Sequence, residues 1–238
     1  TFAVFATGRC WDQIRQSIAY PNLDVKIVAT HAGITVGGDG ASHQALEDIG
    51  LMRSLPNMTV IVPADGIEAY KAVKAAADLC GPCYVRLGRA DVPMLTSMES
   101  DFIIGKATVL REGSDVTLVG CGQMVAACMD AAEELQKRGI EAEVVNMSTI
   151  KPLDEEALLR SAEKTGAVVT AEEHSITTGL GSAVASVLGE NLPTPMKMIG
   201  TPDCFGESGE SEELMRRYGL TAERIALAAE EVIRRKRQ

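Results

Sequence analysis

The sequence is poor in aromatic side chains and histidine, and it lacks extended basic or apolar runs. Aromatic residues make up 4% of the 238 residues, there are three histidines, and the net charge is −10. Because nucleic-acid binding needs a basic face, nucleic acid is excluded as a partner. The basic run Arg234–Arg237 is expected to be the last turn of a helix, where cations complement the dipole. No run reaches the ~18–20 apolar residues of a membrane span, so no membrane association is expected.

The six cysteines include a close pair, Cys80 and Cys83, with the spacing of a redox or metal motif. A redox pair sits at the start of a helix, whereas this pair follows a predicted helix and leads into a predicted strand. A zinc site would need two further ligands, and the sequence offers no second pair or nearby histidine. We therefore expect buried, inert thiols. Free thiols without a recognisable secretion signal indicate a reducing, cytoplasmic location.

Short apolar runs alternate with segments of helical periodicity, which indicates an α/β fold with parallel-rich sheets. Strands are expected at 26–30, 60–62, 84–87, 115–120, 142–147, 167–171 and 196–199. Helices are expected at 9–19, 43–54, 65–79, 123–138, from 152 onward, at 179–189 and at 221–236, with Asp65 and Thr221 as N-caps.

A stretch rich in polar residues and proline, at roughly 88–103, separates two halves of similar pattern, so we predict two α/β domains. Their bounds are 1–92 and 111–238, with a linker at 93–110 that leads into the second domain. The first domain is expected to lack its opening elements, because residue 1 is Thr rather than Met and opens directly into an apolar segment.

The glycine-rich segment 30–44 carries two of the three histidines, His31 and His43, with Asp39 between them. It begins where a predicted strand ends, and open α/β sheets bind ligands beyond the carboxyl ends of their strands. Histidine titrates near neutral pH, and glycine lets the backbone approach a ligand closely. The segment therefore predicts a site for a polar small molecule, with a surface loop whose histidines only form hydrogen bonds as the alternative.

Three further features are weaker indications of a binding site. Arg86 and Arg89 end a predicted strand and could hold a carboxylate or phosphate, but for Arg86 a surface ion pair is favoured. The small residues of 178–185 resemble a dinucleotide fingerprint and are more typical of close helix packing. His174, beside two carboxylates, is expected to be a structural hydrogen-bonding partner.

Several segments, taken in order, resemble transketolase, and most closely the separate C-terminal subunit of split transketolases. They correspond to the pyrimidine-binding domain and then to the C-terminal domain of that family, and together they span almost the whole chain. The segments are Thr1–Thr7, Asp12–Arg15, Ala29–His31, Val36–Gln44, Leu55–Met58 and Pro63–Gly66, followed by Thr149–Asp154, Thr170–His174 and Phe205–Gly209.

The resemblance implies an enzyme that uses thiamine diphosphate and a divalent metal ion to move a two-carbon ketol unit between sugar phosphates. Phe5, with Phe2 close by, would pack on the aminopyrimidine ring of the cofactor, because an aromatic face suits a flat heterocycle. The cofactor would supply the bond-breaking chemistry, and the protein would supply orientation and electrostatics.

The resemblance also implies roles for the glycine-rich segment. His31, Asp39 and His43 would hydrogen-bond the hydroxyl groups of the substrate, and the two histidines would help to move protons. Arg89 would bind the substrate phosphate. The insertion around Arg9 leaves the role of that side chain open.

The activating glutamate of the family, and the domain that binds the diphosphate and the metal, have no counterpart in this sequence. No metal ligand is therefore assigned to this chain, and Mg²⁺ or Ca²⁺ would be held by an N-terminal transketolase subunit. The chain alone should be inactive. Because the sites of the family form between subunits, we expect a homodimer of this chain within a heterotetramer.

Other functions stay possible at this stage. Deoxyxylulose-phosphate synthase and the beta subunit of 2-oxo-acid dehydrogenases share the domain order but lack the arrangement around His31. Transketolases that form dihydroxyacetone or act on branched sugars also remain open. A catalytically inactive interaction subunit would be expected to lose His31, Asp39 and Arg89, and all three are present.

Overall fold

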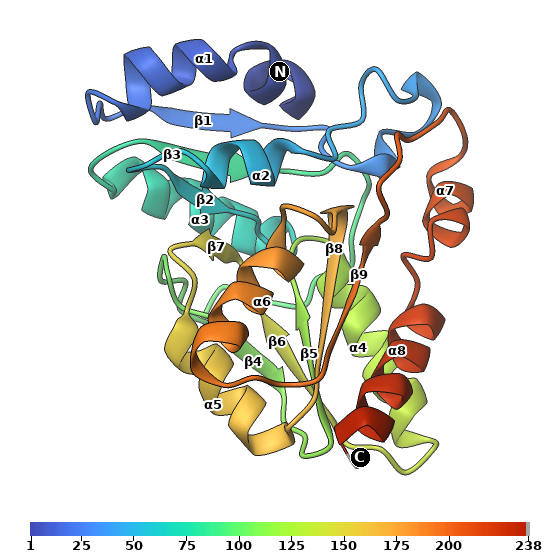
Figure 1. The fold of residues 1–238 in the computed structure, drawn as a ribbon. Coiled ribbons are helices and arrows are strands. Elements are labelled where there is room, and N and C mark those ends of the chain that lie inside the picture. The colour runs from blue at the N-terminus through green and yellow to red at the C-terminus, as the bar shows by residue number, and fades with distance from the viewer. Residues whose placement is uncertain (237–238) are drawn as a thin grey trace.

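The computed structural model describes residues 1–236 and contains two sheets that lie one above the other (Figure 1). The C-terminal helix ends with Arg234, Arg235 and Lys236, as the basic run predicts, and Arg237 lies outside the described residues. No helix within residues 1–236 is long and apolar enough to cross a lipid bilayer.

The first sheet has the order β1-β3-β2-β7. Its parallel strands are β1 (Lys26–Ala29), β3 (Cys83–Arg86) and β2 (Thr59–Ile61), and β7 (Thr149–Lys151) pairs antiparallel with β2. The helical elements of this half are η1 (Phe5–Arg9), α1 (Trp11–Ile14), η2 (Arg15–Ala19), η3 (Ile34–Asp39), α2 (Asp48–Arg53) and α3 (Gly66–Asp78). The second half of the chain thus contributes one strand to the first sheet.

The second sheet has the order β4-β6-β5-β8-β9. Its strands are β4 (Thr108–Arg111), β6 (Ala142–Asn146), β5 (Val116–Gly120), β8 (Val168–Ser175) and β9 (Met196–Thr201), and all pairs are parallel except β4 with β6. Helices α4 (Met124–Gln136) and α8 (Ala222–Lys236) pack together on one side, and α5 (Glu155–Thr165) and α6 (Leu180–Asn191) on the other (Figure 1). Helix α7 (Ser211–Arg217) lies beside η3 of the first half.

Side-chain caps fix where several helices begin. Asp65 Oδ1 accepts a hydrogen bond from Glu68 N at 2.8 Å at the start of α3, and Thr221 Oγ1 accepts one from Arg224 N at 3.3 Å before α8. Both caps were expected from the sequence, because a short polar side chain there satisfies an amide that the helix leaves unpaired. The strand–helix alternation of both halves is confirmed.

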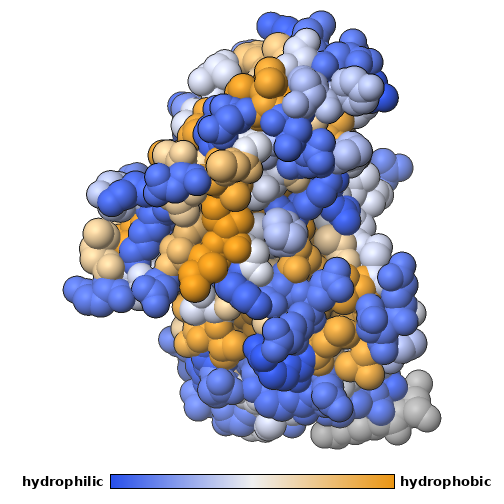
Figure 2. Space-filling view, turned by 90° about the vertical axis from the view of Figure 1, so that its left-hand side faces the viewer, coloured by the Kyte–Doolittle hydropathy of each residue, from blue (hydrophilic) through white to orange (hydrophobic). Residues whose placement is uncertain are grey.

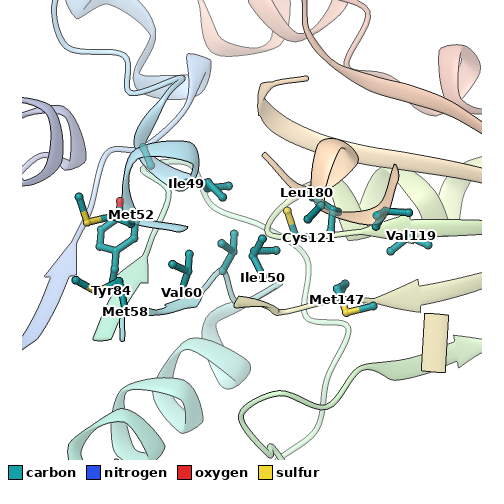
Figure 3. Close-up of a cluster of buried hydrophobic side chains, with 14 of the residues drawn as sticks. Ile49, Met52, Met58, Val60, Tyr84, Val119, Cys121, Met147, Ile150 and Leu180 are labelled. Carbon is teal, nitrogen blue, oxygen red and sulfur yellow. The ribbon is translucent and has the colours of Figure 1, made fainter. Parts of the chain in front are cut away.

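A continuous hydrophobic core joins the two halves. Figure 3 shows Tyr84 and Val60 of the first sheet and Met58, just before β2, in one cluster with Val119 of the second sheet and Met147, just after β6. Every residue of β5 and β6 is buried, as expected for central strands covered on both faces. The ends of the two sheets are therefore fixed relative to each other, which places the first half's loops against the second half.

Several elements differ from expectation. The helix predicted at 43–54 forms only over Asp48–Arg53, and β4, β7 and α7 were not predicted. Residues 87–107, all of which the structure describes, form neither helix nor strand, in keeping with the linker. The domain bounds of 1–92, 93–110 and 111–238 stay a prediction.

The prediction of buried thiols is right for Cys83 and wrong for Cys80. Cys83 lies buried in β3, where burial raises the pKa of its thiol to about 11. The expectation that Cys80 is buried is wrong, because it lies in the turn that follows α3 and its side chain is exposed.

Candidate active site

The candidate site lies beyond the carboxyl end of β1, and the first residues of the chain form one wall of it. Residues 1–3 run parallel to Thr30, with Ala3 N donating to Thr30 O at 2.7 Å. This pairing sets Phe2 against His31, whose ring is stacked on it with centroids 4.0 Å apart and an interplanar angle of 9°. The main-chain pairing therefore brings together two rings that are 29 positions apart in the sequence.

Two more rings complete an aromatic cluster made of Phe2, Phe5, His31 and His43. The rings of Phe2 and Phe5 are nearly parallel, with centroids 6.1 Å apart. His43 approaches both edge-on, at 5.7 Å from Phe2 and 5.2 Å from Phe5. Arg9 lies over the Phe5 ring, with its guanidinium carbon 4.5 Å from the centroid. Four of the predicted site residues thus lie at one place.

The two histidines are each oriented by the hydroxyl group of the preceding residue. His31 Nδ1 lies 2.8 Å from Thr30 Oγ1, and His43 Nδ1 lies 2.9 Å from Ser42 Oγ. His31 also has a φ of 58°, which is uncommon for a residue other than glycine. Because the hydroxyl contacts occupy Nδ1, Nε2 is the nitrogen that remains for a ligand on both rings.

The other two predicted residues, Asp39 and Arg89, form an ion pair beside the same loop. Arg89 Nη1 lies 3.0 Å from Asp39 Oδ2 and donates to Val36 O at 2.7 Å. Both side chains are about half exposed, at 48% for Arg89 and 43% for Asp39. They line an open cleft of 540 Å³ that Gly209 and Ser211 of the second half also line. The cleft offers a cation and a carboxylate to a small polar ligand.

Arg86 is not at the surface, so the expectation of a surface ion pair is wrong. Its Nε donates to Asp48 Oδ2 at 2.8 Å, and the exposed fractions are 5% and 0%. Tyr84 donates to the same oxygen at 2.6 Å. Burial raises the pKa of Asp48, but the Arg86 charge and these hydrogen bonds outweigh it and hold that pKa below its usual value. Strand β3 is central, so its last residue meets the second half of the chain instead of solvent.

His174 is a structural residue, as the sequence predicts. Its Nε2 accepts from Ile49 N at 3.1 Å, and its Nδ1 lies 2.9 Å from Ser175 O, so Nδ1 must carry the proton. Burial lowers the pKa of His174 to about 4, which keeps this ring neutral at pH 7. The ring thereby joins the start of α2 to the end of β8.

The glycines of 178–185 serve helix packing, again as expected. The Glu172 carboxylate accepts from Leu180 N at 2.6 Å and from Gly181 N at 2.8 Å, so it caps α6. A side chain on Gly179 would collide with Glu172 and His174. Burial raises the pKa of Glu172 to about 7.

The residues of the second half that hold the glycine-rich loop in place were not predicted from the sequence. Glu173 Oε1 accepts from Thr35 N at 2.6 Å, and Ser211 Oγ donates to Thr35 O at 2.9 Å. Gln44 Nε2 donates to Glu207 O at 2.9 Å. These partners are more than 100 positions apart in the sequence, and no local pattern signals their contacts.

The donor set suits a flat organic group better than a metal ion. Within residues 1–236, no group of three or more His, Cys, Asp and Glu side chains is placed to hold a metal ion. The nearly parallel faces of Phe2 and Phe5, with imidazole edges beside them, fit a planar heterocycle.

Comparison with known proteins identifies two domains that together cover most of the chain. The family model of the transketolase pyrimidine-binding domain matches residues 1–94, and that of the transketolase C-terminal domain matches residues 105–225. The chain belongs to the transketolase family. Membership implies that the chain is part of a split transferase enzyme, and the family is one that binds thiamine diphosphate and a divalent metal ion.

Relatives of this transketolase chain include components of enzymes that act on different sugars. The 6-deoxy-6-sulfo-D-fructose transketolase subunit SqwH of Clostridium sp. strain MSTE9 is 48% identical over 99% of this chain and 73% of the relative. A subunit of the apulose-4-phosphate transketolase of Phocaeicola vulgatus is 39% identical over 98% and 75%. A solved split-gene transketolase, described as an inactive beta4 tetramer, is 52% identical, with a TM-score of 0.93 over 99% of this chain and 75% of that one.

Proposed function

We propose that this chain is the C-terminal subunit of a split transketolase, which transfers a two-carbon ketol unit between sugar phosphates with thiamine diphosphate. One observation carries the proposal: the aromatic cluster and the Asp39–Arg89 pair lie around a single loop beyond the carboxyl end of β1. This arrangement offers a face for a flat ring beside groups for hydroxyls and a phosphate.

Phe5 and Phe2 would hold the aminopyrimidine ring. Both rings are partly exposed and nearly parallel, so a planar group can stack on them with little loss of conformational freedom. When bound, thiamine diphosphate supplies the stabilisation of the two-carbon unit. The chain's own residues orient that group and shape its surroundings.

His31 and His43 would bind substrate hydroxyls and move protons through Nε2. The hydroxyl groups of Thr30 and Ser42 fix the ring planes through Nδ1, so neither ring has to reorganise when a substrate binds. His31 also distinguishes this site from those expected in deoxyxylulose-phosphate synthase and in the beta subunit of 2-oxo-acid dehydrogenases.

Arg89 would bind the phosphate group, and Asp39 would bind a hydroxyl of the same sugar. A guanidinium group matches a phosphate because it presents several N–H donors in a fixed plane. In the structure Arg89 is paired with Asp39, and both are open to the 540 Å³ cleft. A sugar phosphate entering this cleft would meet both residues.

An N-terminal transketolase subunit would complete the site by holding Mg²⁺ or Ca²⁺ and the diphosphate. Two relatives are themselves described as transketolase subunits. The chain also exposes large apolar side chains on and before the edge strand β1, namely Tyr20, Leu23 and Val28. Exposed apolar groups of this kind are typical of interaction surfaces, and Figure 2 shows hydrophobic residues gathered near the centre of one face. A homodimer of this chain within a heterotetramer, in a reducing cytoplasm, completes the proposal.

Reconstitution tests this function. The chain is mixed with an N-terminal transketolase subunit from the same source, thiamine diphosphate and Mg²⁺, and ketol transfer from xylulose 5-phosphate to an aldose phosphate is followed. Transfer by the mixture, and none by either chain alone, is the expected result. An associated, folded pair without transfer from any ketose phosphate would overturn the proposal and favour an inactive interaction subunit.

A further inference from the structure

We propose that Glu173 in the second half of the chain is a positioning residue for the substrate loop, defined as Gly33–Gln44, and that it thereby sets the affinity for substrate. The inference rests on the proposed function, because it takes Asp39 and His43 of this loop as substrate-binding residues. Through Glu173 the second domain would contribute to substrate binding, although none of its residues needs to contact the sugar.

Glu173 is fitted against the start of the substrate loop. Its Oε1 accepts from Thr35 N at 2.6 Å, and its Oε2 accepts from the side-chain amide of Gln123. Gln123 Nε2 also lies 3.3 Å from Thr35 Oγ1. Gly33 has a φ of 87°, and a side chain there would collide with the Glu173 carboxylate. The loop backbone and the carboxylate therefore approach as closely as a glycine allows.

A second set of contacts holds the same loop from helix α7 and the turn before it. Ser211 Oγ donates to Thr35 O, so both backbone polar groups of Thr35 are bound by side chains of the second half. Gln44, at the other end of the loop, donates to Glu207 O. The loop is thus held near both ends by residues outside the first domain.

These contacts are strong because they are buried. Glu173 and Thr35 are 4% and 3% exposed, so an amide that lost its partner would stay out of water. A hydrogen bond to a carboxylate is about twice as strong as one between neutral groups. Glu173 is itself fixed, since its backbone oxygen accepts from Arg86 Nη2 at 2.9 Å. A rigid support of this kind keeps binding groups in place.

Hydrogen exchange of the full chain tests the contact without any need for activity. In Glu173→Ala, exchange of the amides in 33–41 should rise about tenfold or more, because Thr35 N loses its acceptor. Glu173→Gln should give a clearly smaller rise than Glu173→Ala, since its amide oxygen can still accept from Thr35 N, although without the charge of the carboxylate, while Gln123 turns to accept from its nitrogen. Ser211→Ala, a milder change at the rim, should give a smaller rise in the same segment.

Glu172→Gln is the matched control. Glu172 is the neighbouring residue and is equally buried, but its carboxylate bonds the start of α6 instead of the loop. It should lower the melting temperature and leave exchange in 33–41 unchanged. Unchanged exchange in folded Glu173→Ala, or an equal rise in Glu172→Gln, would overturn the inference.

Kinetics of the reconstituted pair supply the second readout. Glu173→Ala should raise KM for the ketose phosphate about fivefold or more, because Asp39 and His43 of the loop are proposed to bind substrate hydroxyls, and it should lower kcat less, because Phe2 and Phe5, which are proposed to hold the cofactor, lie outside the loop. Faster amide exchange in the loop of Glu173→Ala together with an unchanged KM would overturn the proposed dependence of substrate affinity on the position of the loop. If the wild-type pair transfers no ketol unit, the proposed function fails, and the exchange experiment still decides whether Glu173 holds the loop.

Discussion

Arg89 Nη1 lies 3.0 Å from Asp39 Oδ2, so the cation proposed to bind phosphate is paired with a carboxylate of the substrate loop. Both side chains are about half exposed, and an exposed pair of this kind contributes little to stability. A phosphate group, with its greater charge, can therefore take the place of the carboxylate on the guanidinium. On the proposed roles, Asp39 would then be released toward the sugar, which would tie the recognition of the phosphate to that of the hydroxyls.

Arg89→Lys should weaken the binding of phosphorylated substrates selectively. The ammonium group keeps the charge but loses the planar set of donors, so KM for a ketose phosphate should rise about tenfold. KM for the unphosphorylated ketose should hardly change, and this comparison in the reconstituted enzyme is the measurement. Arg111→Lys, on the edge strand β4 of the other sheet, is the control. An equal effect on both ketoses would contradict the assigned role of Arg89.

Phe5→Ala should weaken the binding of the cofactor. Removal of the ring takes away one face of the aromatic cluster, and the apparent affinity for thiamine diphosphate should fall about tenfold. The measurement is activation of the reconstituted enzyme as the cofactor is titrated. Tyr70→Ala removes an exposed ring from α3, outside the cluster, and should have no effect. Equal activation curves for Phe5→Ala and the wild type would remove Phe5 from the cofactor site.

The stability of the chain should depend on His174 in weak acid. This ring stays neutral in the folded chain down to a pKa of about 4, whereas its ordinary value is 6.5. Between these values the unfolded chain binds a proton that the folded chain does not. The contribution of His174 to stability should therefore fall as the pH drops from 6.5 toward 4, by about 1.4 kcal/mol per pH unit.

His174→Gln isolates this effect, because its amide oxygen can still accept from Ile49 N. Burial raises the pKa of Glu172 to about 7, so the contribution of Glu172 to the stability of the chain rises as the pH falls through the same range. Since Glu172 is present in both proteins, the difference between their unfolding free energies reports on His174. Parallel stability curves for the two proteins between pH 6.5 and 4 would show that the ring is not held neutral.

The cysteines should divide into two classes of reactivity. Cys10, Cys80 and Cys204 are exposed and should react with a thiol reagent in the native chain. Cys83, Cys121 and Cys128 are buried, and burial raises the pKa of Cys128 to about 12, so these should react only after unfolding. Mass spectrometry of the labelled peptides makes the assignment. Protection of Cys80 would contradict the position of the turn after α3.

The regular elements could be predicted because their signals are local. Strands such as β5 and β6 are short apolar runs, and the capping of α3 by Asp65 can be recognised from residues three positions apart. Strand β7 has three residues and exists because β2 lies beside it, which no pattern within 149–151 reveals. The expected helix at 43–54 begins only at Asp48, because the backbone at Ala45 pairs with Ala32 in a parallel bridge and accepts from Gly33 N.

In the candidate site, too, residues with local sequence signals could be predicted and residues that depend on distant contacts could not. His31, Asp39 and His43 stand out because three polar groups lie close together in a glycine-rich segment. Arg86 was expected at the surface because its partner, Asp48, lies 38 positions away and the contact depends on how the two halves pack. Glu173 reaches the loop across 138 positions, so its contact could come only from the folded structure.

The most direct test of the central claim is the binding of thiamine diphosphate, measured by calorimetry in the presence of Mg²⁺. This chain is proposed to supply the faces for the pyrimidine ring, and the partner subunit is proposed to hold the metal and the diphosphate. Binding should therefore be seen with the mixture of the two subunits, at one cofactor per pair of chains, and with neither chain alone. Equally tight binding by this chain alone, or an assembled mixture that binds no cofactor, would contradict it.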